Sequence, residues 1–92
     1  MALDLHRTDT KTFIFSLDEK TFHSLHPVFK AFYKKTGLQF DLYKDLQLSV
    51  GFQKTLIQLL NENLFEDSQI IQFKNILEKL TNEGINLSFY AD

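Results

Sequence analysis

Serine nucleophiles and glycine-rich phosphate loops are two common signs of an enzyme. None of the serines in this 92-residue chain lies in a Gly-x-Ser-x-Gly sequence, which would hold a nucleophile on a sharp strand-to-helix turn. Gly37, Gly51 and Gly84 are isolated from one another, so they form no phosphate-binding loop. A carboxylate pair such as Asp41 and Asp45 would need a pocket that shifts a pKa, and no pattern indicates one. The sequence therefore predicts that this protein is not an enzyme.

Two histidines have a spacing that metal ligands often show. His23 and His26 are three residues apart on a predicted helix. Asp18 and Glu19 lie one turn earlier, and imidazole and carboxylate ligands both suit zinc. However, no further strong ligand follows at motif spacing, and the chain has no cysteine. We therefore expect surface histidines, one of them in contact with Glu19 at i, i+4, and we predict neither a metal nor a cofactor.

Charge is unevenly distributed along the chain. Residues 1–40 carry six basic and four acidic side chains, whereas residues 41–92 carry four basic and eight acidic ones. This asymmetry argues against nucleic acid as a ligand, because phosphate binding needs clustered Lys and Arg. An acidic half suits a basic protein partner, although a solvated acidic face is the commoner explanation.

Residues 1–10 are expected to be a polar lead-in that precedes the folded part of the chain. They contain no apolar run, which argues against a signal peptide. No segment is long and apolar enough to span a membrane. The lack of cysteine fits a reducing compartment. The expected location is the cytoplasm, without membrane contact.

The segment 40–49 places Tyr43 between two carboxylates just before a predicted helix. A tyrosine flanked by acids is a good protein-binding anchor, because its ring is rigid and apolar and its tip is polar. The same segment is also explained as a loop braced by its own side chains, with Asp45 bonding nearby backbone amides. The sequence leaves both interpretations open.

The first predicted elements are a strand and a helix. The strand covers residues 12–17, which are rich in aromatic and β-branched side chains. The helix is capped by Ser16 or Asp18 and ends at Gly37. Pro27 is expected to kink this helix or to divide it in two.

The remaining elements are two helices and a strand. Residues 38–43 are either a short strand or an ordered loop that plugs the core, and the alternatives stay open. Helices are then predicted over residues 49–64, with Phe52 facing inward, and from a cap at Asp67 or Ser68 to Gly84. A strand over residues 85–90 closes the chain.

These elements indicate one α/β domain of the α+β type. Two or three strands, contributed by the two ends of the chain, would form a small sheet packed against three helices. The predicted shared core consists of Phe13, Phe15, Leu25, Phe29, Leu56, Leu60, Phe73, Leu77, Leu87 and Phe89.

A sequence pattern over residues 38–92 resembles a family of short bacterial immunity proteins. The pattern is Asp41-x-Tyr43-x-Asp45-x-x-Leu48-Ser49, then two amphipathic helices, then Leu87-x-Phe89-x-x-Asp92. The family pattern has Pro at the position of Leu42 and Gly at those of Lys44 and Ala91. In element order and size the chain is also similar to barstar-like ribonuclease inhibitors. Both resemblances imply a protein that binds and neutralises a toxin domain in the cell that makes it.

The predicted function is therefore stoichiometric inhibition of a cognate toxin domain, in a system such as contact-dependent growth inhibition. A nuclease is one option for the toxin, because nuclease clefts are basic and suit an acidic partner. The alternative is a homodimeric structural or regulatory module that pairs an edge strand or a helix face. The residues expected to bind the partner are Asp41, Tyr43, Asp45, Glu62, Glu66 and Asp67.

Overall fold

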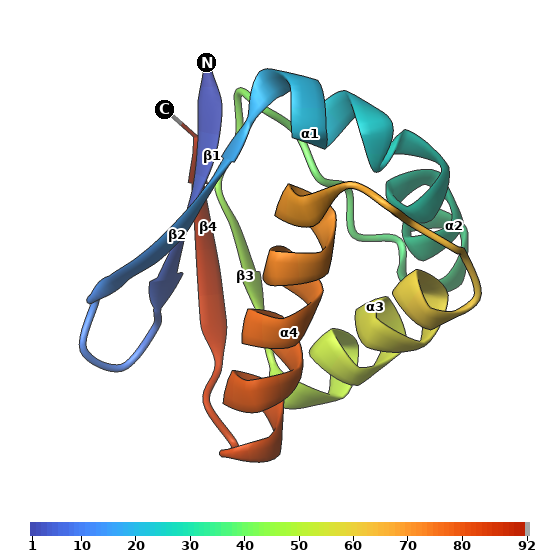
Figure 1. Cartoon of the computed structure of the whole chain (residues 1–92). Coiled ribbons are helices and arrows are strands. Elements are labelled where there is room, and N and C mark those ends of the chain that lie inside the picture. Colours follow the sequence, from blue (N-terminus) through green and yellow to red (C-terminus); the bar gives the residue numbers. More distant parts are fainter. Residues whose placement is uncertain (92) are drawn as a thin grey trace.

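A computed structural model describes residues 1–91 as a four-stranded antiparallel sheet with four helices (Figure 1). All four helices pack on one face of the sheet, and the other face carries no helix from the described residues. The strand order is β2-β1-β4-β3. The elements are β1 (Ala2–Arg7), β2 (Phe13–Asp18), α1 (Glu19–Ser24), α2 (His26–Thr36), β3 (Leu46–Leu48), α3 (Val50–Asn61), α4 (Ser68–Asn82) and β4 (Leu87–Ala91).

The fold is of the α+β type, as predicted, but the expected polar lead-in was wrong. Residues 2–7 form β1, which pairs with β2 on one side and with β4 on the other. Leu3 and Leu5 are fully buried and alternate with Asp4 and His6, which point to the open face. This alternation of buried and open-face residues, with a period of two, is typical of a strand. The apolar pattern is short and lies among charged residues, which is why the sequence did not indicate a strand here. The sheet therefore has four strands.

Pro27 divides the predicted first helix in two, which is why there are four helices. α1 ends at Ser24, and Pro27 sits in the first turn of α2, where its missing N–H removes no helical hydrogen bond. Of the two candidate caps, Asp18 begins α1, since its Oδ1 accepts the N–H of Thr21 at 2.7 Å. The left-handed Gly37, with φ of 78°, ends α2 as predicted.

Residues 38–43 form an ordered loop, which confirms the second of the two interpretations. Phe40 and Leu42 are 5% exposed and fill the core from this loop. The Phe40 ring stacks on Phe29 with centroids 4.3 Å apart and meets Phe89 edge-on at 5.0 Å. The loop is therefore held by aromatic packing, and β3 begins only at Leu46.

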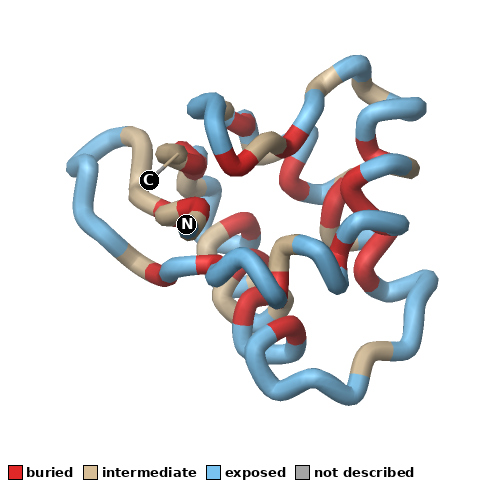
Figure 2. The backbone as a smooth tube through the Cα atoms, turned by 90° about the horizontal axis from the view of Figure 1, so that it is seen from above, coloured by how far each residue is buried: buried red, intermediate tan, exposed pale blue. Residues whose placement is uncertain are grey.

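The predicted core is confirmed at every residue except Phe13, which is 55% exposed. Leu5 pairs with Phe15 but His6 pairs with Phe13, so Ile14 is an extra, bulged residue in β2. The bulge turns Phe13 to the open face, where its ring meets His6 at 5.5 Å. Buried residues otherwise concentrate where helices and strands face one another, and the connections are mostly exposed (Figure 2).

Candidate protein-binding surface

The loop between α2 and β3 carries three of the predicted partner-binding residues. Asp41 Oδ1 accepts the N–H of Tyr43 at 2.8 Å, and the turn closes with a bridge between Asp41 and Lys44. Asp45 Oδ1 accepts the N–H of Ala91 at 2.8 Å, which ties the loop to the last strand. Both carboxylates thus brace the backbone, while the Tyr43 side chain is 72% exposed. A further role of these residues in binding a partner stays a prediction.

The loop between α3 and α4 carries the other three predicted residues. Asp67 caps α4, since its Oδ1 accepts the N–H groups of Gln69 at 2.8 Å and Ile70 at 3.3 Å. Glu62 ends α3, and both Glu62 and Glu66 are exposed. Among residues 1–91, neither glutamate side chain makes a hydrogen bond or an ion pair. Their charges are therefore available to a partner.

Leu64, in the middle of the same loop, was not among the predicted residues. Its side chain is fully exposed to solvent, at 101% of the reference area. The backbone on either side is held in place: Asn63 Nδ2 donates to the Leu59 carbonyl at 2.8 Å, and the partly buried Phe65 packs against the core. Leu64 is thus an apolar side chain held in water by an ordered loop. The sequence placed Leu64 at the end of the helix predicted over residues 49–64, whereas α3 ends at Asn61 and leaves Leu64 in the loop.

A small hollow beside Leu64 extends this surface onto α4. It has a volume of about 170 Å³ and is lined by Leu64, Phe65 and Ile71 among others. Ile71 is itself 43% exposed. Leu64 and Ile71 thus line one hollow together with Lys74, and the exposed Glu62 and Glu66 flank Leu64 in the sequence. We refer to Glu62, Leu64, Glu66 and Ile71 as the acidic-apolar surface.

The two groups of predicted residues come from separate loops. Within the described chain, no hydrogen bond or ion pair joins residues 41–45 to residues 62–67. The structure joins Asp45 instead to Ala91, next to Asp92 of the resemblance pattern, and Asp92 lies outside the described residues. The six residues are therefore not brought together as one cluster by direct contacts.

The histidines lie apart from any cluster of ligands. His23 and His26 are exposed, and residues 1–91 contain no group of three or more His, Asp or Glu side chains placed to hold a metal ion.

Two carboxyl groups have a lowered pKa, and the cause of each is a neighbouring group. The Arg7 side-chain hydrogen bonds lower the pKa of Asp9, and the Thr21 backbone N–H lowers that of Asp18. The two lowered pKa values thus result from a surface ion pair and from a helix cap.

Within residues 1–91, no helix combines the length and the apolar character needed to cross a bilayer. Comparisons with models of protein families, with curated proteins and with solved structures found no match to the chain. A function must therefore be inferred from the surfaces themselves.

Proposed function

We propose that this chain is a stoichiometric protein-binding inhibitor, of the kind that bacterial immunity proteins represent. Its partner would be a toxin domain with a basic surface, and the acidic-apolar surface would be the principal contact. The observation that carries the proposal is the fully exposed Leu64 on a loop whose backbone is braced.

Leu64 has the properties of a binding anchor. Complexes gain most of their affinity from a few side chains that become fully desolvated, surrounded by contacts that exclude water. Because Asn63 and Asp67 already fix the loop, little conformational entropy would be lost when Leu64 is buried by a partner. Single exposed leucines are common on monomers. Here Leu64 lies beside a hollow that the exposed Ile71 also lines, so the apolar area extends beyond one side chain.

The carboxylates supply the second half of the proposal. Glu62 and Glu66 flank Leu64 in the sequence and are exposed. Acidic groups at the rim of an interface increase the rate of association with a basic partner and discriminate against other acidic proteins. Tyr43, which is also largely exposed, is a second candidate anchor on the other loop.

The test is co-expression with a toxin domain encoded beside this chain, followed by binding measurements on the purified pair. We expect rescue of growth and a dissociation constant of about 1 nM or lower, because an inhibitor without turnover must hold every toxin molecule. Leu64→Ser should weaken binding by about tenfold or more, mainly through faster dissociation. Tyr33→Ser is the control, because it removes another exposed large side chain, 51% exposed on α2, that lies outside the acidic-apolar surface.

Charge reversal tests the carboxylates separately. Glu66→Lys should slow association and reduce its dependence on salt. Glu83→Lys is the control, since α4 has 15 residues and Glu83 lies about 22 Å from Asp67 at the opposite end of that helix. Equal effects of the two reversals, or normal binding by Leu64→Ser, would show that the toxin does not bind this surface.

The homodimeric module remains the second candidate, and the edge strand β2 favours it. The only charged residue of β2 is Asp18 at its end, and Phe13 is 55% exposed at its start. Edge strands with few charges can pair with another chain, although the bulge at Ile14 opposes it. A dimer in light scattering that is dissociated by Phe13→Lys would support this candidate. A monomer at high protein concentration would exclude it.

A further inference from the structure

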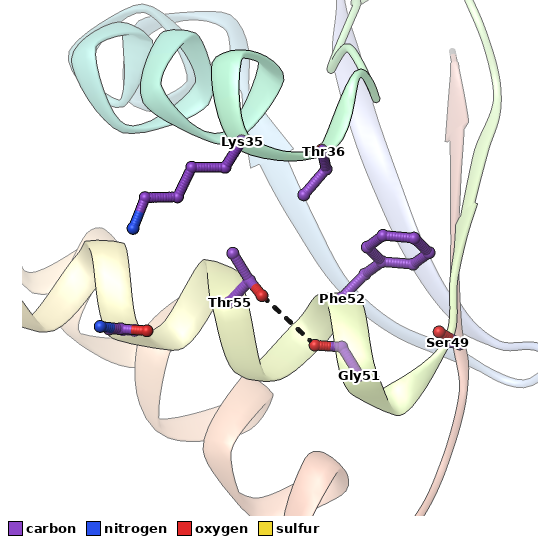
Figure 3. Close-up of a pocket in the computed structure, with 7 residues that line it drawn as sticks. Lys35, Thr36, Ser49, Gly51, Phe52 and Thr55 are labelled. Atoms are coloured by element: carbon purple, nitrogen blue, oxygen red, sulfur yellow. Dashed lines mark hydrogen bonds between the residues drawn. The ribbon is translucent and has the colours of Figure 1, made fainter.

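A hollow of about 580 Å³ lies between the end of α2 and the start of α3, away from the loops discussed above (Figure 3). This volume falls within the range of small-molecule sites in proteins. Its walls include Lys35 and Thr36 from α2, and Ser49, Phe52, Thr55 and Gln58 from α3 and the residue before it.

Phe52 faces this hollow instead of the core, which corrects the predicted inward position. α3 directs Gln53, Leu56 and Leu60 to the core, so the preceding Phe52 turns toward the end of α2. α2 ends at Gly37, where the chain turns away, and Phe52 remains 40% exposed. Part of the Phe52 side chain is therefore accessible from the hollow.

Within the described part of the chain, three polar side chains of the hollow have no hydrogen-bond partner or only a weak one. The Lys35 side chain extends across the gap toward α3 and makes no ion pair or hydrogen bond (Figure 3). Ser49 does not cap α3 with its side chain. The Thr55 hydroxyl makes only a 3.5 Å bond to the Gly51 carbonyl. These groups are free to bind a ligand.

The local charge is positive although the whole chain is negative. No acidic residue occurs between Glu19 and Asp41, so α2 carries Lys30, Lys34 and Lys35 without a single carboxylate. The only charged residue of α3 is Lys54. The residues that line the hollow include one cation, Lys35, and no carboxylate, so the lining favours an anion even in a protein of formal net charge −2. The nearest carboxylate along α3 is Glu62, the residue that caps its C-terminal end.

We propose that this hollow binds a small organic anion that contains a planar ring. The ring would pack against Phe52, and the anionic group would pair with Lys35. A helical peptide fits less well, because helix-binding grooves have an apolar lining along their length and Phe52 is the only large apolar side chain in these walls. The site is separate from the acidic-apolar surface, so each proposal can fail without the other.

The probe is 1-anilinonaphthalene-8-sulfonate, an aromatic anion whose fluorescence rises in an apolar site. N-phenyl-1-naphthylamine, the same ring system without the sulfonate, separates the ring from the charge. We expect saturable binding of one anionic dye per chain. Lys35→Ala should weaken binding of the anion by about tenfold, as loss of a charge-assisted contact predicts, and leave the neutral dye unchanged. Phe52→Ala should weaken binding of both dyes.

Lys34→Ala is the matched control, since it removes the same charge from the neighbouring position of α2 without touching the hollow. We expect it to bind the anion as the native chain does. Backbone amide shifts caused by the dye should fall on residues 33–37 and 49–58. Equal losses in Lys34→Ala and Lys35→Ala, shifts confined to the open sheet face, or no saturable binding would each overturn the proposal. Thermal melting of every variant establishes that it is folded.

Discussion

The side-chain oxygen of Gln53 accepts the backbone N–H of Leu87 at 2.9 Å, so a polar residue of α3 fixes the start of the last strand. The Gln53 amide also donates to the Thr81 hydroxyl at 3.0 Å and to the Ile85 carbonyl at 2.9 Å. Gln53 is fully buried, and its hydrogen-bonding groups are satisfied. This one side chain therefore joins α3, the end of α4 and the beginning of β4.

Replacing this glutamine with an apolar residue of similar size should be costly. Gln53→Leu leaves the Leu87 N–H and the Ile85 carbonyl without their side-chain partner in a buried place. We expect a loss of about 2 kcal/mol or more in the free energy of unfolding. Urea denaturation measures it, with the exposed Gln58→Leu as the control, for which we expect about 0.5 kcal/mol or less. Equal losses in the two variants would show that the buried amide contributes little.

Local sequence signals predicted the ends of α1 and α2, whereas α3 ends at Asn61, three residues before the predicted end. The cap at Asp18, the break at Pro27 and the left-handed Gly37 each depend on a few neighbouring residues. Gln53 could not be found in this way. Its burial depends on Thr81 and Leu87, which are distant in the sequence, and the apolar Phe52 beside it matched the helical pattern better.

The sheet was also hard to predict, because strand pairing depends on residues that are distant in the sequence. β1 becomes an inner strand only because β4, from the opposite end of the chain, pairs with it. The bulge at Ile14, which exposes Phe13, is a property of the register between two strands.

In the candidate site, the sequence indicated Tyr43, Glu62 and Glu66, because their polar side chains are of types that are usually exposed. Leu64 was missed, because nothing local distinguishes an exposed leucine from a buried one.

Alanine substitutions of Phe73 and Phe13 test which of these two residues belongs to the core. Phe73 is fully buried between Phe15 and Phe89, with ring centroids at 6.3 and 6.4 Å. Phe73→Ala should lower the free energy of unfolding by about 3–5 kcal/mol, through lost transfer energy and a residual cavity. Phe13→Ala, on the open face, should cost about 1 kcal/mol or less. Chemical denaturation of both variants tests the assignment, which a loss below about 1 kcal/mol for Phe73→Ala would contradict.

Asp18 should make stability depend on pH. The Thr21 N–H lowers the pKa of Asp18 in the folded state, so the charged carboxylate stabilises the fold. This contribution is complete above the carboxyl pKa of the unfolded chain, and it is lost as pH falls through the lower pKa of the folded state. The stability difference between the native chain and Asp18→Ala should therefore shrink in acid. The difference between Asp18→Asn and Asp18→Ala should stay constant, since the Asn cap has no carboxyl to protonate.

The hydrogen bond from the Ala91 N–H to Asp45 should stabilise the end of the last strand. Asp45→Ala removes the acceptor of the Ala91 N–H, whereas Asp45→Asn keeps an oxygen in that place. We expect Asp45→Ala to cost about 1 kcal/mol and to speed hydrogen exchange at the Ala91 amide. Asp45→Asn should do neither, and Glu66→Gln should leave stability unchanged. If hydrogen exchange at the Ala91 amide is unaltered in Asp45→Ala, Asp45 does not stabilise the strand, and partner binding is its only expected role.

Two glycines should respond to alanine with opposite signs. Gly37 has φ of 78°, in the left-handed region that L residues rarely adopt, and an added methyl group would meet no atom within 4 Å. Gly37→Ala should therefore destabilise by about 1 kcal/mol through backbone strain alone.

Gly51 lies in the first turn of α3 with an ordinary φ, and its nearest contact for an added methyl group is the Ser49 hydroxyl at 3.9 Å. Gly51→Ala restricts the unfolded chain without strain in the folded one, so it should stabilise by about 0.5 kcal/mol. Paired thermal and urea unfolding of both variants measures the contrast. Destabilisation by Gly51→Ala would mean that the start of α3 is packed more tightly than these contacts imply.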